Sequence, residues 1–550
     1  MSLRTDLTRA IADARDRAIA SGALSIPDGA ALPAVGLERP ANPEHGDWAS
    51  NVAMQLAPVA RAAPMRIAEA IGARFEPPPS IAEAALAAPG FLNFRVNPAW
   101  VGAQVGPILD AGPGYGHSVA EASRRINVEF VSANPTGPLH VGNARGAFVG
   151  DVLSRVLTAA GHQVSREYYF NDFGTQVVNL GLSVLARRKR TELPEDGYHG
   201  AYVDELAAEL PDDLLARAEA EPAEAGMIVG RWASERVRAG IEASLARLGV
   251  RFDVWKEEGS LHGEGWVERA VDRLREAGHV YEEGGATWFR STSFGDDKDR
   301  VVYRSNGQPT YFASDIGYVT EKFDRGFDEL IYIWGADHHG TVARVRNAAE
   351  AMGYDREAVR MLLIAWVRFV RDDAEIAMSK RTGEFVTLDE LLDEVGVDAA
   401  RWFFSSRAFT SGIDFDLELA KKQSNENPVY YVQYAHARAS SILRHAAEAR
   451  VAPDAARTGE LLVHPSEQAL VRHLLDLPDT VAAAAERRET HEVPRYAYEL
   501  ASAFSAFYRD CKVLSEDPAL SAARLALVAA TRSVLANALD LLGISAPESM

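Results

Sequence analysis

The stretch SANPTGPLHVGNARGAF (Ser132–Phe148) joins two runs that have different hydrophobic periods. The run before it, INVEFV (126–131), alternates apolar and polar residues, which is typical of a strand. The run after it carries apolar residues at helical spacing and ends at Gly161. A second strand pattern, QVSREYYF, follows at 163–170. A strand, a loop, a helix and a further strand form a parallel crossover unit, so the stretch predicts an α/β domain with a parallel sheet.

The loop itself contains groups that suit a nucleoside triphosphate. A helix that begins after a parallel strand directs its free N–H groups toward the carboxyl edge of the sheet, where ligands of such sheets bind. His140 and Asn143 can donate hydrogen bonds to phosphate oxygens, and Gly142 leaves room for a flat ring on the backbone. The sequence contains no P-loop motif. Taken alone, the loop is equally compatible with a proline-rich turn that holds a hydrogen-bonded histidine.

A second loop strengthens the nucleotide interpretation. EIAMSKRTGEFVTLDELL (Glu375–Leu392) ends in a helix pattern that Thr387 can cap. Its polar part contains Met378, Ser379 and Lys380. A lysine on a loop can follow charge as it moves during phosphoryl displacement, although most loop lysines are solvated surface groups. Two such loops in this order, about 240 residues apart, favour one site built from both.

The chain divides into three predicted parts. Residues 1–115 form a separate α+β module that ends in a glycine-rich linker. The α/β pattern occupies 120–425, with a mostly helical and charged insertion at about 190–285. From 426 to 550 the pattern is almost purely helical. A chain of 550 residues is far too long for one core, so several domains are expected.

Composition narrows the class of protein. The formal net charge of −20 argues against a general nucleic-acid coat but permits an enzyme with local basic faces. No apolar run approaches the ~20 residues of a membrane span, and the N-terminus does not have the pattern of a signal peptide. The single cysteine, Cys511, excludes a cysteine zinc cluster and indicates a cytoplasmic protein. His338 and His339 are adjacent and have no third ligand at suitable spacing, so no structural metal is expected.

The two loops resemble the paired signatures of the class I aminoacyl-tRNA synthetases. HVGN (His140–Asn143) is similar to their HIGH motif, and AMSKR (Ala377–Arg381) is similar to KMSKS. Five blocks, in order along nearly the full chain, resemble the arginyl-tRNA synthetases in particular: VEFVSANPTGPLHVGNARGAFVGD, FGDDKDRVVYRSNGQPTYFASDIGY, IYIWGADHHG, NENPVYYVQYAHARASSIL and LLGISAPESM. The resemblance implies a Rossmann-like parallel-sheet catalytic domain, an N-terminal additional domain and an all-α C-terminal anticodon-binding domain.

The resemblance also implies a reaction. Members of the family activate L-arginine with ATP to arginyl-adenylate and transfer arginine to the 3′-terminal adenosine of tRNA(Arg), releasing AMP and pyrophosphate. Mg2+ accompanies ATP. The carboxylate of arginine is itself the nucleophile, so positioning and electrostatics are expected to carry the reaction. The implied partners are tRNA(Arg), L-arginine and ATP, and we expect a monomer that does not attach to a membrane.

Matching the family motifs residue by residue gives the expected site. The expected catalytic residues are His140, Asn143 and Lys380. The expected ATP-binding residues are His140, Gly142, Asn143, Met378, Ser379 and Lys380. The expected arginine-binding residues are Glu129, Asn134, Glu258, Tyr311, Asp315 and His338. The expected tRNA-binding residues are Asn42, His45, Asp47, Tyr434 and Arg438.

For some of these residues a structural role remains open. Glu258 lies in a charged segment and is equally compatible with a solvated surface group. The loop that contains Asn42 and Asp47 can simply cap its own helix. Tyrosines at helical spacing, such as Tyr434, are more often core residues than base platforms.

Two positions depart from the family pattern. Asn143 replaces the second histidine of the HIGH motif, so this position can donate a hydrogen bond but cannot become charged. Ala377 replaces the first lysine of KMSKS, so activity is expected to depend more heavily on Lys380.

Three other functions fit parts of the sequence less well. An adenylyltransferase of another type would be shorter and would lack the helical C-terminal domain. A tRNA-binding paralogue without activity is disfavoured, because His140, Lys380, Tyr311 and Asp315 are all present. A synthetase for another amino acid is disfavoured, because Asp315 and Glu258 suit a cationic side chain.

Overall fold

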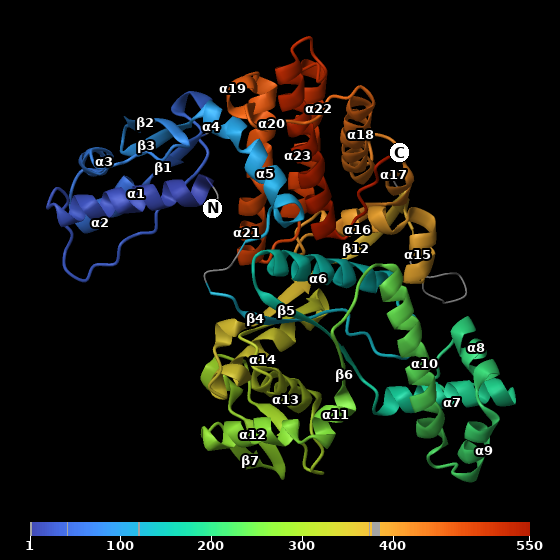
Figure 1. The fold of residues 1–550 in the computed structure, drawn as a ribbon. Helices are drawn as coiled ribbons and strands as arrows, with labels where there is room; N and C mark the ends of the chain where they lie inside the picture. Colours follow the sequence, from blue (N-terminus) through green and yellow to red (C-terminus); the bar gives the residue numbers. More distant parts are fainter. Residues whose placement is uncertain (1–2, 41, 119–121, 373, 377–385) are drawn as a thin grey trace.

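The computed structural model describes residues 3–40, 42–118, 122–372, 374–376 and 386–550. The N-terminal part packs helices against a three-stranded antiparallel sheet of order β1-β3-β2 (Figure 1). The elements are α1 (Leu3–Ala20), β1 (Trp48–Ser50), α2 (Val52–Ala60), α3 (Pro64–Gly72), β2 (Ile81–Ala87), β3 (Phe91–Val96), α4 (Pro98–Ala103) and α5 (Val105–Ala111).

The centre of the molecule is a five-stranded parallel sheet of order β11-β10-β4-β5-β6, which confirms the predicted α/β class. The first four residues of the run INVEFV lie in β4, which begins at Arg125 and ends at Glu129, so Phe130 and Val131 fall outside the strand, whereas QVSREYYF forms β5 with the predicted bounds. The strands and their helices are β4 (Arg125–Glu129), α6 (Val141–Ala159), β5 (Gln163–Phe170), α7 (Thr175–Lys189), β6 (Val254–Glu257), α13 (Tyr311–Asp324), β10 (Glu329–Gly335), α14 (His339–Ala351) and β11 (Val359–Ile364).

The segment at about 190–285 is largely helical, as expected, but it also supplies an edge strand of the central sheet. This strand, β6, pairs with β5 through Glu167–Val254 to Phe170–Glu257. A small antiparallel sheet, β7-β8-β9, follows. The elements are α8 (Ala201–Glu209), α9 (Asp212–Ala220), α10 (Ala225–Arg247), α11 (Glu258–Gly263), α12 (Trp266–Glu276), β7 (Val280–Glu283), β8 (Ala286–Phe289) and β9 (Arg300–Tyr303).

A third small sheet, of order β13-β12-β14, connects the central sheet to the helical C-terminal part. Its elements and the neighbouring helices are β12 (Val367–Arg371), β13 (Ala374–Glu375), α15 (Leu388–Val395), α16 (Val397–Ser405), β14 (Ile413–Asp416) and α17 (Leu417–Lys421). The C-terminal helices are α18 (Pro428–Glu448), α19 (Thr458–Leu461), α20 (Pro465–Leu475), α21 (Leu477–Arg487), α22 (Glu492–Asp510) and α23 (Pro518–Leu542). Among the described residues, α23 alone is long and apolar enough to cross a bilayer, and 67% of its most apolar window is buried in the protein.

Helix α6 lies between the central sheet and the C-terminal helices (Figure 1). Its Asp151 accepts a hydrogen bond from Arg401 at 2.9 Å, and both side chains are buried. The same Arg401 guanidinium donates to the backbone carbonyls of Leu248 and Leu542. Four distant segments therefore meet at one arginine, and this contact fixes α6 relative to the C-terminal helices.

Candidate active site

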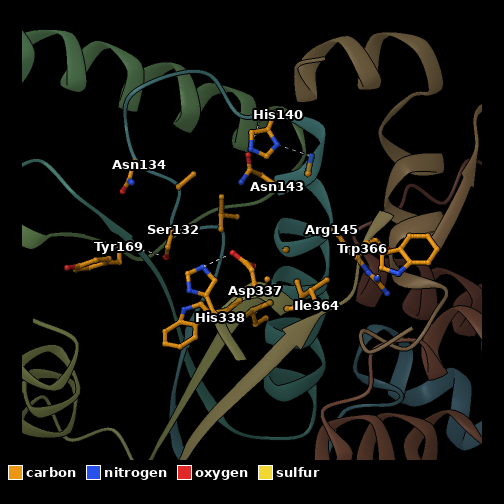
Figure 2. A pocket seen from close by; sticks show the side chains of 18 of the residues that line it. Ser132, Asn134, His140, Asn143, Arg145, Tyr169, Asp337, His338, Ile364 and Trp366 are labelled. Carbon is orange, nitrogen blue, oxygen red and sulfur yellow. Dashed lines mark hydrogen bonds and ion pairs between the residues drawn. The ribbon is translucent and has the colours of Figure 1, made fainter. Parts of the chain in front are cut away.

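A cavity of about 1010 Å3 opens at the carboxyl ends of the parallel strands, where open α/β sheets bind their ligands. Figure 2 shows side chains from the loop after β4, the start of α6, and the ends of β10 and β11 around this space. The expected residues that line it are Asn134, His140, Gly142, Asn143, Glu258, Tyr311, Asp315 and His338. Glu129 lines an adjoining cavity that shares Tyr311 and Asp315 with the first.

The end of the cavity near α6 is built by the capping of that helix. His140 occupies the N-cap position, and its Nδ1 accepts a hydrogen bond from the Gly142 N–H at 3.1 Å. The Asn143 side-chain oxygen accepts from the His140 N–H at 3.1 Å, which orients the amide (Figure 2). Burial lowers the pKa of His140, so the ring is neutral at pH 7 and carries its proton on Nε2.

Position 142 has room only for glycine, because the imidazole ring of His140 lies against its Cα. A Cβ at position 142 would lie 2.8 Å from both Cε1 and Nδ1 of that imidazole. On the expectation from the sequence that the His140 ring contacts a phosphate of ATP, we predict that Gly142→Ala displaces the ring and raises the KM for ATP about tenfold, since one charged hydrogen bond contributes about 1.5–3 kcal/mol. ATP-dependent steady-state kinetics at saturating arginine and tRNA measure this effect. An unchanged KM for ATP would show that the ring does not contact the nucleotide.

The second predicted loop returns to the first at its C-terminal end. Thr387 forms a β-bridge with His140, and the Val141 N–H donates to the Val386 carbonyl at 3.2 Å. Thr387 also caps α15, as expected, with its hydroxyl accepting from the Glu390 N–H. Met378, Ser379 and Lys380 lie outside the described residues. The residues that follow them are therefore in direct contact with the HVGN turn.

Part of the cavity wall is acidic. Glu258 begins α11 directly after β6, and Asp315 lies on α13. The pKa of Asp315 is raised to about 7 by burial, then by the charges of Glu129 and Glu258. Burial also raises the pKa of Glu258 and of Glu129. Burial makes these carboxyl groups costly to ionise. A permanent cation that binds beside them would stabilise their charged form.

The remaining expected contacts surround this acidic part of the wall. Tyr311 is the first residue of α13 and is 74% exposed. The Asn134 amide donates to Gln176 at 2.7 Å. The His338 Nε2 atom lies 3.5 Å from Asp337 Oδ2, and the ring centroid of His338 is 5.6 Å from that of Trp334. All of these side chains remain within reach of a ligand in the cavity.

Several residues that line the cavity were not predicted, and Tyr169 and Ser132 are two of them. Tyr169 lines the cavity, and its backbone N–H donates to the Ser132 hydroxyl at 3.2 Å; burial, and then the charge of Glu258, raise the pKa of the Tyr169 hydroxyl. Ser132 has a φ of 40° and follows Val131, with a φ of 68°, so the turn after β4 is strained at the edge of the cavity. Tyr169 could have been found from its place at the carboxyl end of the predicted strand 163–170.

Arg145 was also not predicted. It is buried and lines the cavity. Its guanidinium donates to the carbonyls of Ala365 at 2.8 Å and Ala408 at 2.9 Å. Burial lowers the pKa of Arg145 to about 10, which leaves it charged at pH 7. This contact joins α6 to the end of β11 and therefore holds two walls of the cavity together.

The expected tRNA-binding residues lie away from the cavity. Asn42 caps its own turn by accepting from the Glu44 N–H at 3.0 Å, and His45 is exposed. Asp47 accepts from the Val96 N–H at 2.7 Å and lies 3.3 Å from Arg472, so its carboxylate has structural partners.

On α18, the Arg438 guanidinium lies over the rings of Tyr434 at 4.6 Å and Tyr508 at 5.1 Å. Tyr430 stacks on Tyr434 with ring centroids 6.2 Å apart. Tyr434 and Arg438 are only partly buried, and Tyr508 is 45% exposed. A half-exposed array of aromatic and guanidinium groups suits unstacked bases.

A parallel sheet with HVGN at the start of its first crossover helix, an adjoining second loop and a helical C-terminal part defines a class I aminoacyl-tRNA synthetase. A solved Mycobacterium tuberculosis methionyl-tRNA synthetase shares this fold, with a TM-score of 0.54 at 14% identity over 76% of this chain and 91% of that chain. Family models match the arginyl-tRNA synthetase N-terminal domain at 1–96, the class I (R) catalytic domain at 104–204 and 224–405, and the DALR anticodon binding domain at 432–550.

Relatives with higher sequence identity than this methionyl enzyme indicate which amino acid the family attaches to tRNA. The arginine–tRNA ligase of Moorella thermoacetica is 46% identical over 556 residues, which cover 99% of this chain and 98% of that protein. The solved arginyl-tRNA synthetase of Thermus thermophilus has a TM-score of 0.78 at 26% identity and covers both chains completely. The chain belongs to the arginyl-tRNA synthetase family.

Proposed function

We propose that the cavity at the carboxyl edge of the sheet is where this arginine–tRNA ligase joins ATP to L-arginine and then passes arginine to the 3′-terminal adenosine of tRNA(Arg). One observation carries the assignment of the site. A helix N-terminus with neutral His140 and oriented Asn143 shares a single cavity with the carboxylates of Glu258 and Asp315. The helix N-terminus suits a triphosphate, and the carboxylates suit a permanent cation.

At the acidic part of the wall, Asp315 and Glu258 bind the guanidinium of arginine, and Tyr311 closes over it. Asn134 and Glu129 bind the α-amino and carboxylate groups. His338 contacts the substrate from the end of β10. A planar guanidinium can donate to two carboxylates at once, whereas a neutral side chain would leave these buried acids without a partner.

At the start of α6, His140 donates from Nε2 to a phosphate oxygen, and the Asn143 amide donates to another. Gly142 lies below the adenine. Lys380, with Met378 and Ser379 beside it, stabilises the charge that develops on the α-phosphate as pyrophosphate leaves. No protein nucleophile is needed, because the carboxylate of arginine attacks the α-phosphorus.

Mg2+ enters with ATP and supplies charge neutralisation of the phosphates. Asp337 lines the cavity and is 81% exposed at its side chain, so it fits the preference of this ion for carboxylate oxygen and water. For tRNA, we assign Asn42, His45 and Asp47 to the elbow, and Tyr434 and Arg438 to the anticodon loop. We further propose a cytoplasmic monomer with no structural metal.

The raised pKa of Asp315 predicts a pH dependence of arginine binding. Its pKa is about 7 instead of 3.8, and only the ionised carboxylate pairs with the guanidinium. The KM for arginine should therefore fall as pH rises from 6 to 8, by up to about tenfold per pH unit below the pKa. Aminoacylation kinetics across this range measure it. A KM that rises with pH would contradict the assignment of Asp315.

The proposed function is tested by a screen of the twenty amino acids for AMP release, run with and without total tRNA. Only arginine should support AMP release above background, and only when tRNA is present should labelled arginine become acid-precipitable. Release driven by another amino acid, or by none, would overturn the proposed substrate. A matched run with citrulline, which has arginine's shape without its charge, tests the acidic part of the cavity wall directly.

A further inference from the structure

One face of α13 carries a line of polar groups that extends beyond the cavity. Tyr311, Asp315, Tyr318 and Lys322 are spaced by four, three and four residues, so they lie on the same side of the helix. The first two face the cavity, and the last is fully buried below it. Lysine is almost never fully buried unless it is paired, so Lys322 requires an explanation.

The ammonium group of Lys322 is directed at Glu129. Its Nζ donates to Glu129 Oε2 at 2.6 Å. It also lies 4.2 and 4.1 Å from the ring centroids of Tyr318 and Tyr332, which hold a cation by their π faces. The other carboxylate oxygen, Oε1, accepts from the Ser132 hydroxyl at 3.1 Å. Lys322 therefore determines the orientation of a carboxylate that it shares with the substrate site.

Glu129 has little other support for its charge. It is 4% exposed, and the charged and titratable groups that face it come from three elements. They are Asp315, Tyr318 and Lys322 on α13, Glu167 and Tyr169 on β5, and Tyr332 on β10. Lys322 is the cation in this set. Burial and Glu167 raise the pKa of Glu129, and Lys322 and Ser132 oppose them.

We propose that Lys322 is a positioning residue for arginine binding, which acts by holding Glu129 ionised and oriented toward the α-amino group of the substrate. This inference rests on the role of Glu129 proposed above. Lys322 itself does not touch the substrate. Its loss leaves a buried carboxyl group that takes up a proton, and a protonated carboxyl cannot pair with an ammonium.

The test is Lys322→Met, which keeps an unbranched side chain one atom shorter than lysine and removes the charge. The KM for arginine should rise at least tenfold at pH 7, while kcat at saturating arginine changes by less than threefold. The ratio of the variant KM to the wild-type KM should fall as pH rises from 6.5 to 8.5, because higher pH restores the Glu129 carboxylate. A ratio that does not change with pH would overturn the proposal.

Arg325→Met is the matched control. Arg325 directly follows the same helix as its C-cap residue, and its buried partner Glu167, at 2.8 Å, is not among the residues that line the cavity. This variant removes a cation from the same polar cluster but should leave the KM for arginine within threefold of wild type. A rise as large as that of Lys322→Met would show that general disruption of α13 explains both results, and the proposal would fail.

A double-mutant cycle covers the case in which Lys322→Met does not fold. Glu129→Gln with Lys322→Met removes both charges of the pair. Its KM for arginine should be within threefold of that of Glu129→Gln alone, because Lys322 acts only through Glu129. A further tenfold rise would overturn the proposal. If Glu129→Gln itself leaves the KM unchanged, the proposed role of Glu129 fails instead, so the two failures are distinguishable.

Discussion

Replacement of Asp315 by asparagine is expected to lower kcat/KM for arginine about a thousandfold. Truncating one partner of a buried, hydrogen-bonded charge pair costs about 2–5 kcal/mol, and each 1.4 kcal/mol is a factor of ten. Asparagine has the same shape as aspartate, so the loss reports the missing charge and not a cavity. Steady-state aminoacylation at varied arginine, with ATP and tRNA saturating, measures the effect.

Asp324→Asn is the control for this variant. Asp324 is the last residue of the same helix and is exposed, so the substitution should change kcat/KM by less than twofold. A second control is discrimination against citrulline, which should decrease in Asp315→Asn because the fixed charge no longer selects the guanidinium. Equal losses in both variants would remove Asp315 from the arginine site.

The same residue is expected to destabilise the ligand-free protein. Its folded-state pKa, about 7, lies above the ordinary 3.8, so the folded state binds more protons than the unfolded state between these values. The free energy of unfolding therefore falls as pH rises from about 4 to 7, and the penalty is fully present above pH 7. In the proposed site, bound arginine would offset this penalty by pairing with the carboxylate. A carboxyl group that lowers the stability of the ligand-free protein is what the proposed cation site would require, since functional sites often reduce stability.

The fold could be predicted from the sequence where local pattern and tertiary environment agree. Most of the run 126–131 lies in β4 (Arg125–Glu129), where alternation at period two predicts a strand, and the run 163–170 forms β5, where Val164 and three consecutive aromatic residues favour a strand. The strand β6 was not predicted. It consists of four residues, Val254–Glu257, in a charged segment, and an edge strand this short carries no readable period.

Some residues of the candidate site could be predicted from the sequence, and others could not. His140 and Asp315 belong to motifs that are continuous in the sequence, so both could be named before the structure. Arg145 could not, because its partners Ala365 and Ala408 are more than 200 residues away and are backbone carbonyls. Lys322 lies eleven residues from Tyr311 on one helix, but only the fold brings β4, and with it Glu129, beside the helix. Contacts made through tertiary structure leave no local pattern.

Replacement of Lys380 by alanine is expected to lower the rate of adenylate formation a hundredfold or more. Removal of one hydrogen-bond donor that stabilises charge in a transition state lowers kcat by a factor of about 10²–10³. Position 377 of this chain is alanine where the family motif has its first lysine, so Lys380 has no second lysine of the motif to compensate for its loss. ATP–pyrophosphate exchange with arginine and tRNA present measures the step.

A large loss of rate in Lys380→Ala is expected because the described residues that follow Lys380 in the chain contact the start of α6. Val386 and Thr387, which follow it in the chain, contact Val141 and His140 at the start of α6, so the end of this loop is anchored beside the proposed phosphate site. Lys380→Arg keeps a positive charge and should retain more exchange activity than alanine, whereas Lys298→Ala, at an exposed loop lysine that is not among the cavity-lining residues, should be indistinguishable from wild type. Near-normal exchange in Lys380→Ala would mean that the helix N-terminus with His140 and Asn143 is sufficient to stabilise the departing pyrophosphate, and the two-loop mechanism would have to be abandoned.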